Sequence, residues 1–81
     1  MAHVTFMTQL RQFTGGVASV DVDANSIQQL QRILSERFPE LAPHLEAGVA
    51  VAIDGQIYQD ALFQEIAPTS EVHLLPMIAG G

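Results

Sequence analysis

The sequence contains neither cysteine nor lysine in its 81 residues. Without cysteine, the chain has no disulfide bond, no thiolate ligand for a metal and no thiol nucleophile. Because disulfides are rare in the reducing cytosol, this composition suits a cytoplasmic protein, and we expect that location. The lack of lysine leaves two explanations open. One is a compositional bias toward arginine, and the other is a chain that avoids acylating itself while it carries an activated carboxyl group.

Basic charge and long apolar segments are also scarce. Three arginines stand against nine acidic residues, which gives a net charge of −6. This charge has the wrong sign for binding a phosphate backbone, so nucleic acid is disfavoured and a basic protein surface is the natural complement. No apolar run approaches the roughly 18 residues that span a bilayer, and the first residues lack the pattern of a secretory signal. We therefore expect no membrane association.

The length of the chain limits what it can do. A domain of 81 residues has a small core, because it buries only about 60 to 65% of the surface that its unfolded chain exposes. A deep substrate cavity of several hundred Å³ would consume much of that core. The composition, 48% hydrophobic and 15% charged, is that of a folded globule. These properties indicate a compact folded domain with little room for a deep substrate cavity.

Two strands are expected near the start of the chain. Residues 3–7 and 17–22 alternate apolar and polar side chains, as half-buried strands do. In the second segment we expect Ala18, Val20 and Val22 to share one face. Gly15 and Gly16 lie between the segments and can supply the positive φ of a hairpin connection.

A helix is expected next. Ser26 and Gln29, three residues later, match a capping box, and Pro39 discourages continuation beyond Phe38. Apolar residues then recur at helical spacing and predict one face packed on a sheet. They are Ile27, Leu30, Ile33, Leu34 and Phe38.

The second half of the chain predicts three more strands. Residues 40–48 suggest an irregular turn or a short helix, and residues 49–58 form a hairpin around Asp54-Gly55, a pair suited to a type I′ turn. The last strand begins at Glu71 or Val72. The fold class is therefore α+β, with a mixed sheet of four to five strands packed on one main helix.

The last strand predicts an interaction surface. If Val72 and Leu74 face the helix, then Leu75 and Met77 face away, because side chains alternate along a strand. Leu75 and Met77 are then exposed next to the end of the chain and can bind a partner, unless a neighbouring loop or strand covers them. We place the domain at residues 1–77 and a flexible tail at residues 78–81, which end in Gly80-Gly81.

These features resemble the ubiquitin-like β-grasp sulfur carriers of the MoaD/ThiS family over essentially the whole chain. Near the start, the segments Gln9-Leu10-Arg11 and Thr14-Gly15-Gly16 resemble the molybdopterin-synthesis and cysteine-synthesis types of carrier. Near the end, Pro76 is shared with both types, and residues 78–81 (Ile-Ala-Gly-Gly) resemble the thiamine type. Leu74, Leu75 and Met77 replace aromatic residues and a second proline of the molybdopterin carriers, so the resemblance does not select a pathway.

The resemblance implies a carrier and not a catalyst. Gly81 would be adenylated by an ATP-dependent enzyme related to ubiquitin-activating enzymes and converted to a thiocarboxylate, with Gly80, Ala79 and Ile78 forming the tail. No cofactor would be bound stably, and the partner would use the ATP. The sulfur would pass to a biosynthetic enzyme such as the large subunit of molybdopterin synthase, or to cysteine or thiamine synthesis. Two alternatives remain: a modifier joined to lysines through Gly81, and a plain binding module.

Other combinations of residues give little support for chemistry. His3, His44 and His73 lack metal-ligand spacing, so we expect no metal site. No serine lies in a Gly-x-Ser-x-Gly context. Asp21 and Asp23 fit a solvated helix entrance better than a general acid and base.

Overall fold

The computed structural model of the protein describes residues 1–47, 49–59 and 61–76. The order of its strands and of its main helix is the one that the sequence predicts, whereas the helix between the first two strands was not predicted. The strands are β1 (Ala2–Phe6), β2 (Ser19–Val22), β3 (Val49–Ile53), β4 (Gln56–Tyr58) and β5 (Glu71–Pro76). The helices are η1 (Thr8–Phe13), α1 (Ile27–Arg37), η2 (Pro39–Leu41) and α2 (Ala42–Ala47), of which η1 and η2 are 3₁₀ helices.

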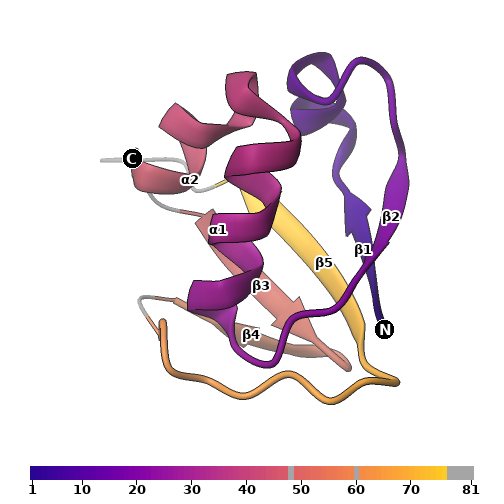
Figure 1. Cartoon of the computed structure of the whole chain (residues 1–81), viewed down its shortest axis with the longest axis vertical. Helices are drawn as coiled ribbons and strands as arrows, with labels where there is room; N and C mark the ends of the chain where they lie inside the picture. The colour runs from indigo at the N-terminus through magenta and orange to yellow at the C-terminus, as the bar shows by residue number, and fades with distance from the viewer. Residues whose placement is uncertain (48, 60, 77–81) are drawn as a thin grey trace.

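The strands form one mixed sheet in the order β2-β1-β5-β3-β4. β1 and β5 are parallel, and the other neighbouring pairs are antiparallel. α1 crosses one face of the sheet, α2 and η1 lie near one end of it, and the loop between β4 and β5 runs along the opposite end (Figure 1). This arrangement confirms the predicted α+β fold, in which one main helix covers a mixed sheet. The segment predicted as a turn or a short helix forms η2 and α2.

The connection between β1 and β2 is longer than a tight hairpin turn. Gly15 and Gly16 have φ of 69° and 88°, as predicted. The Thr14 hydroxyl lies 3.1 Å from the Arg11 carbonyl and 2.8 Å from the Val17 carbonyl. This turn holds the chain through residue 17, so the strand begins only at Ser19, and the prediction of a strand from residue 17 is wrong by two residues.

The start of α1 shows why this helix forms where it does. The Ser26 hydroxyl accepts a hydrogen bond from the Gln29 backbone N–H at 3.2 Å, and the Gln29 side chain accepts one from the Asn25 N–H at 2.6 Å. The predicted capping box is confirmed, although its return bond reaches Asn25 and not Ser26. The next two N–H groups, of residues 27 and 28, donate to carbonyls of the loop between β4 and β5. The cap thus ties the helix to that loop.

The turn between β3 and β4 is of type I′, as predicted. Asp54 has φ of 50° and Gly55 has φ of 88°, so both central residues are in the left-handed region. The twist of this turn matches the twist of the flanking strands, which places Val51 opposite Tyr58.

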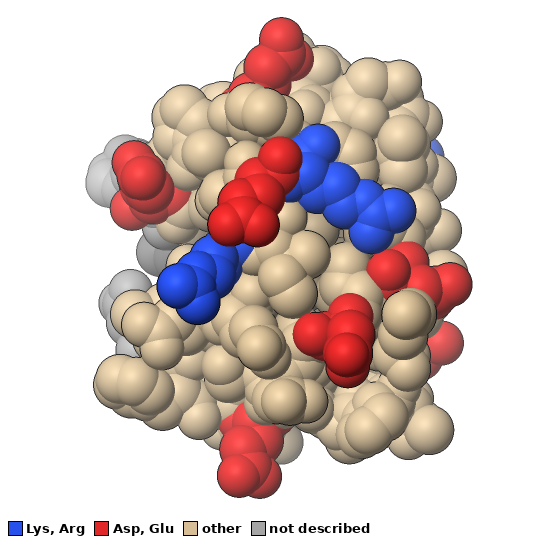
Figure 2. Space-filling view, viewed as in Figure 1, with Lys and Arg blue, Asp and Glu red and all other residues tan. Residues whose placement is uncertain are grey.

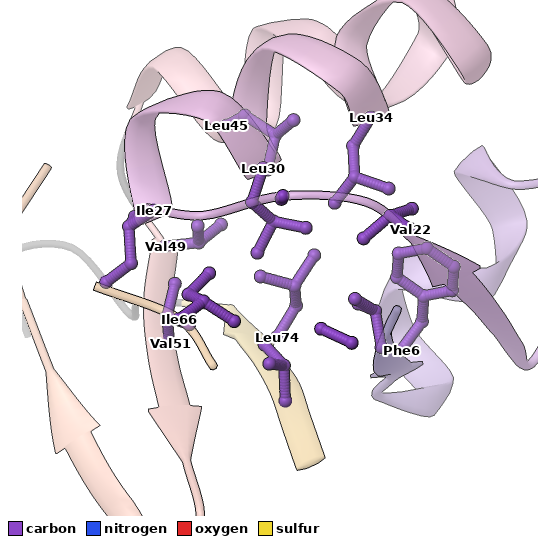
Figure 3. Packing of buried hydrophobic residues seen from close by; sticks show 14 of the residues in the cluster. Phe6, Val22, Ile27, Leu30, Leu34, Leu45, Val49, Val51, Ile66 and Leu74 are labelled. Atoms are coloured by element: carbon purple, nitrogen blue, oxygen red, sulfur yellow. The ribbon is translucent and has the colours of Figure 1, made fainter. Parts of the chain in front are cut away.

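The core lies between α1 and the sheet (Figure 3). Helix residues Leu30 and Leu34 are fully buried against side chains from the central strands. Phe6 packs edge-to-face on Phe38 just beyond α1, with ring centroids 5.6 Å apart. The fully buried large side chains are Val4, Phe6, Leu30, Leu34, Leu41, Val51, Val72 and Leu74.

Candidate functional site

The last described strand runs through the middle of the sheet. β5 is hydrogen bonded to β1 on one side and to β3 on the other. Its final residue, Pro76, lies opposite Val49, the first residue of β3. The chain therefore leaves the sheet at its centre, at the end where η1 and α2 lie (Figure 1). The predicted tail, Ile78, Ala79, Gly80 and Gly81, and the predicted contact residue Met77 lie outside the described residues.

Leu75 lies on the face of the sheet that α1 does not cover. Its neighbour Leu74 points into the core and is 0% exposed, so alternation turns Leu75 to the other side. The predicted direction of Leu75 is confirmed, but the side chain is half-buried and not fully exposed. It sits opposite Ala50 of β3 in the antiparallel register, and cross-strand partners at this spacing shield each other.

Apolar side chains continue from Leu75 across β3 to the edge of the sheet. Ala50 is buried, Ala52 is half-buried, and Ile57 of β4 lies opposite Ala52 with 59% of its surface exposed. We call Ala50, Ala52, Ile57 and Leu75 the open-face patch. The patch begins one residue before the point where the described chain ends.

The same face becomes polar toward the other end of β5. His3 lies between Asp21 of β2 and Glu71 of β5 in the registers of β1. Its Nδ1 is 2.9 Å from an Asp21 carboxylate oxygen. This hydrogen bond, with the negative charges of Glu71 and Asp21, raises the pKa of His3 above its ordinary value. Thr5 and His73 form the next row on this face, in which His73 lies directly opposite Ala52 of the open-face patch.

The η1 loop is fastened to the strand ends beside the exit of the tail. Arg11 Nε donates to the Phe6 carbonyl at 3.1 Å, and the Met7 N–H donates to the Leu74 carbonyl at 3.4 Å. Arg11 therefore steadies its own loop. These two bonds hold η1 next to the end of β5, where Leu74 and Leu75 lie.

α2 contacts η1 through a stacked pair of rings. His44 stacks on Phe13 of η1, with ring centroids 3.8 Å apart and an angle of 29° between the planes. A groove of about 250 Å³ lies next to α2, and its lining residues include Leu45 and Glu46 of α2 and Val49 of β3. A groove of this size takes one or two side chains and not a substrate buried in a deep cavity.

The charges on the helix-covered face do not gather by sign. Figure 2 shows acidic groups spread over this face, with the basic ones among them. Within residues 1–47, 49–59 and 61–76, no group of three histidine or acidic side chains is arranged to hold a metal ion. In the same part of the chain, no helix combines the length and the hydrophobicity needed to cross a membrane.

The sequence of this domain matches a protein-family model. The model of the ThiS family matches residues 4–81, which is nearly the whole chain and includes the segment beyond Pro76. The chain belongs to the ThiS family. The domain thus has the ubiquitin-like β-grasp fold of small sulfur carrier proteins, as the sequence indicated.

Solved structures agree on the fold. CysO of Mycobacterium tuberculosis superposes with a TM-score of 0.81 at 20% identity, over 96% of this chain and 100% of that chain. CysO of Amycolatopsis orientalis, solved in a complex with BexX, gives 0.74 at 20% identity over 100% of both chains. Small archaeal modifier protein 1 of Methanosarcina acetivorans gives 0.79 at 16% identity, over 99% and 95%.

At these identities the three likenesses show the fold and not the function of this ThiS-family chain. No curated protein matches the sequence.

Sequence reasoning missed part of the site. It named Leu75 but not Ala50, Ala52 and Ile57, which the sheet order brings beside it. The alternation in residues 49–53 (VAVAI) carried a signal, because a strand with large residues on one face presents small ones on the other. The order of the strands, which decides that β3 lies next to β5, was not contained in that local pattern.

Proposed function

We propose that this protein is a sulfur carrier that acts through the carboxylate of Gly81. An ATP-dependent enzyme related to ubiquitin-activating enzymes adenylates this carboxylate, and a sulfur donor then converts it to a thiocarboxylate. The sulfur passes to a biosynthetic enzyme of cysteine, molybdopterin or thiamine synthesis. The protein works in the cytoplasm, binds no cofactor stably and is a cosubstrate, with the catalytic groups on its partners.

Activation is needed because a terminal carboxyl group has a pKa near 3.5 and is a carboxylate at neutral pH. A carboxylate is a poor electrophile. Its oxygen attacks the α-phosphorus of ATP, and pyrophosphate leaves. Hydrosulfide, supplied by the sulfur donor, then attacks the carbonyl carbon of the acyl-adenylate, AMP leaves, and loss of a proton gives the thiocarboxylate. After its sulfur has attacked the acceptor, water hydrolyses the acyl–sulfur bond, so the sulfur stays on the acceptor and the carboxylate is restored for another cycle.

The observation that carries this proposal is the match of the ThiS family model to the end of the chain, through Gly80 and Gly81. Two adjacent residues without Cβ allow a backbone to lie against the walls of a narrow channel. The fold supports the same reading, since the tail follows a strand that is held on both sides. A partner can then draw in the tail while the domain stays folded.

The open-face patch, together with Met77, is the surface that we propose for docking these partners. Ile57 is the most exposed member of the patch, and Leu75 lies nearest to the tail. The net charge of −6 favours a partner whose surface around the apolar contact is basic. A complex between CysO and BexX exists for a protein of the same fold, which supports partners of this general kind.

The thiocarboxylate can be tested directly because the chain has no cysteine. We expect protein purified from its native cell to take up one thiol-reactive label, on the fragment that contains Gly81. Intact mass alone is not sufficient, since replacing oxygen by sulfur adds nearly the same mass as oxidising one of the three methionines. Protein that takes up no label, although the acceptor pathway is active in the same cells, would contradict the proposal.

The variant Gly81→Ala separates activation from folding. A methyl group at the reacting residue should obstruct the partner's channel and abolish labelling, while the melting temperature stays nearly unchanged. The matched control is Gly16→Ala, which alters a glycine with φ of 88° in the η1 loop and should lower stability without abolishing labelling. A melting shift in Gly81→Ala as large as the loss of labelling would point to a structural role instead.

A second candidate is a protein modifier. The likeness to small archaeal modifier protein 1 favours it as the alternative, since the same adenylate can be captured by a lysine of another protein. Conjugates that leave a Gly-Gly remnant on lysine after digestion would support this function. If neither a thiocarboxylate nor a conjugate is found, a plain binding module remains.

A further inference from the structure

Two observations belong together: the sequence has no lysine, and β5, the last described strand, ends in the middle of the sheet. The inference below rests on the proposed function, in which Gly81 carries an activated acyl group. Residues 77–81 continue from Pro76 at the centre of the sheet. Five residues span at most about 18 Å, because an extended chain advances no more than about 3.6 Å per residue. The activated carbon can therefore meet only part of the surface of its own domain.

That part of the surface includes α2. Glu46 precedes Val49 by three residues, so its Cα lies within about 11 Å of the Val49 Cα. Val49 in turn is the cross-strand partner of Pro76, and such partners are about 5 Å apart. An amine on the exposed side chain position 46 would thus be well within the reach of Gly81.

An amine at Met1 would lie at the opposite end. His3 pairs with Glu71 in the parallel β1–β5 ladder, which places Met1 level with a point two residues before the start of β5. That point is seven residues from Pro76, or about 23 Å at 3.3 Å per residue. The tail is shorter than this distance. The direction of β1 beside β5 therefore keeps Met1 away from the acyl group.

The other nucleophiles near the tail do not form amides. The His44 ring is stacked on Phe13, and any acyl group that it captured would hydrolyse and regenerate the carboxylate. The Thr14 hydroxyl is buried and lies within hydrogen-bond distance of two backbone carbonyls. Arg11 donates its Nε–H to the Phe6 carbonyl, and a guanidinium group, which has donors but no acceptor, is a poor nucleophile.

We propose that the surface within reach of residues 77–81 is an amine-free zone, which reserves the acyl group at Gly81 for a partner-bound nucleophile. Two consequences follow from the same feature. The charged carrier neither cyclises nor couples to a second copy through a side chain. As a modifier, it builds no branched chains through its own side chains.

The excluded reaction is ordinary aminolysis. The lone pair of a lysine nitrogen would attack the carbonyl carbon of Gly81 and form a C–N bond. The bond to the leaving group, AMP or a thiolate, would break, and the nitrogen would release a proton to solvent. A tether of five residues gives such an amine an effective concentration on the order of millimolar, which favours capture within the chain roughly thousandfold over a partner amine at micromolar concentration.

The test uses the full chain with a thioester installed chemically at Gly81, so that no activating enzyme is needed. Two variants introduce one amine each by the same substitution: Glu46→Lys beside the tail, and Glu65→Lys in the loop between β4 and β5 at the far end of the sheet. Both glutamates are exposed, and neither side chain makes a hydrogen bond or ion pair with the rest of the described chain. Intact mass then follows hydrolysis to the acid and cyclisation, which gives a product lighter by one water molecule.

At protein concentrations too low for coupling between molecules, we expect the unmodified sequence to give only the acid. Glu46→Lys should cyclise at least about tenfold faster than Glu65→Lys, and at high concentration only the two lysine variants should form dimers with the amide at a side chain. Cyclic amide in the unmodified sequence would overturn the proposal, as would a Glu46→Lys protein that stays folded and yields only acid. If instead the thioester behaves as expected but native protein carries no label, the proposed sulfur chemistry fails and the amine-free zone stands.

Discussion

Leu74 and Leu75 are neighbours on β5 that differ in burial, and this difference leads to a quantitative prediction about stability and partner binding. Leu74 is 0% exposed in the core, whereas Leu75 is half-buried in the open-face patch. Truncating a fully buried leucine to alanine removes its transfer free energy and leaves a cavity, which costs about 2.7 to 5 kcal/mol. A domain of 81 residues has a total stability of about 4 to 12 kcal/mol. Leu74→Ala should therefore consume a large share of that stability.

The corresponding shift in melting temperature follows from the unfolding entropy. At about 2.1 cal/mol/K per residue, 81 residues give roughly 0.17 kcal/mol/K. Leu74→Ala should then lower the midpoint by about 16 °C or more. Leu75→Ala removes a side chain that already contacts water, and we expect a loss of at most about 1.5 kcal/mol, or about 9 °C.

Thermal and urea denaturation of both variants measure these values, and partner binding gives the opposite ranking. Leu75→Ala should weaken the complex with the activating enzyme at a temperature at which both variants are folded, while folded Leu74→Ala should bind nearly as the unmodified protein does. If Leu75→Ala unfolds as easily as Leu74→Ala and binds normally, then Leu75 belongs to the core, and the open-face patch is not the docking surface.

Three further predictions concern local structure. The bond to Asp21 favours the protonated His3 ring and raises its pKa in the folded protein. The resulting stabilisation is fully present below the unfolded pKa of histidine, about 6.5, and is lost as pH rises through the folded pKa. His3→Gln should remove this stabilisation. Melting curves of both proteins across this range should converge at high pH, and a constant difference would contradict the assignment. Gly55→Ala should cost about 1 to 2 kcal/mol, since φ is 88° and an added Cβ meets no atom within 4 Å; Gly55→Asn, which tolerates this conformation, should lose less, and equal losses would refute a purely backbone cause. Ser26→Ala should cost about 1 kcal/mol by removing the cap bond to the Gln29 N–H, and an unchanged urea midpoint would show that the loop carbonyls alone cap α1.

The sequence predicted best where a local rule leaves one choice. Asp54-Gly55 determines a type I′ turn, and Ser26 with Gln29 determines a helix start, because each pattern satisfies specific dihedrals or hydrogen bonds within a few residues. The boundary of β2 was missed because the Thr14 hydroxyl closes a turn through the Arg11 and Val17 carbonyls, and side-chain alternation does not report such a bond.

The candidate site was less predictable than the fold because it depends on contacts between distant segments. Alternation gave the direction of Leu75, but its partial burial comes from Ala50, which lies 25 residues earlier in the chain. The stacking of Phe13 on His44 likewise joins two segments whose sequences show no mutual signal.

The central position of β5 has a mechanical consequence. Any force that a bound enzyme applies to the segment beyond Pro76 enters the domain along a strand with hydrogen-bonded neighbours on both flanks. Such a load shears the two ladders together and does not peel one strand from an edge, so many bonds resist it at once. If the segment beyond Pro76 binds in a channel of a partner, as proposed, then pulling it out again loads β5 along both ladders and does not start to unfold the domain.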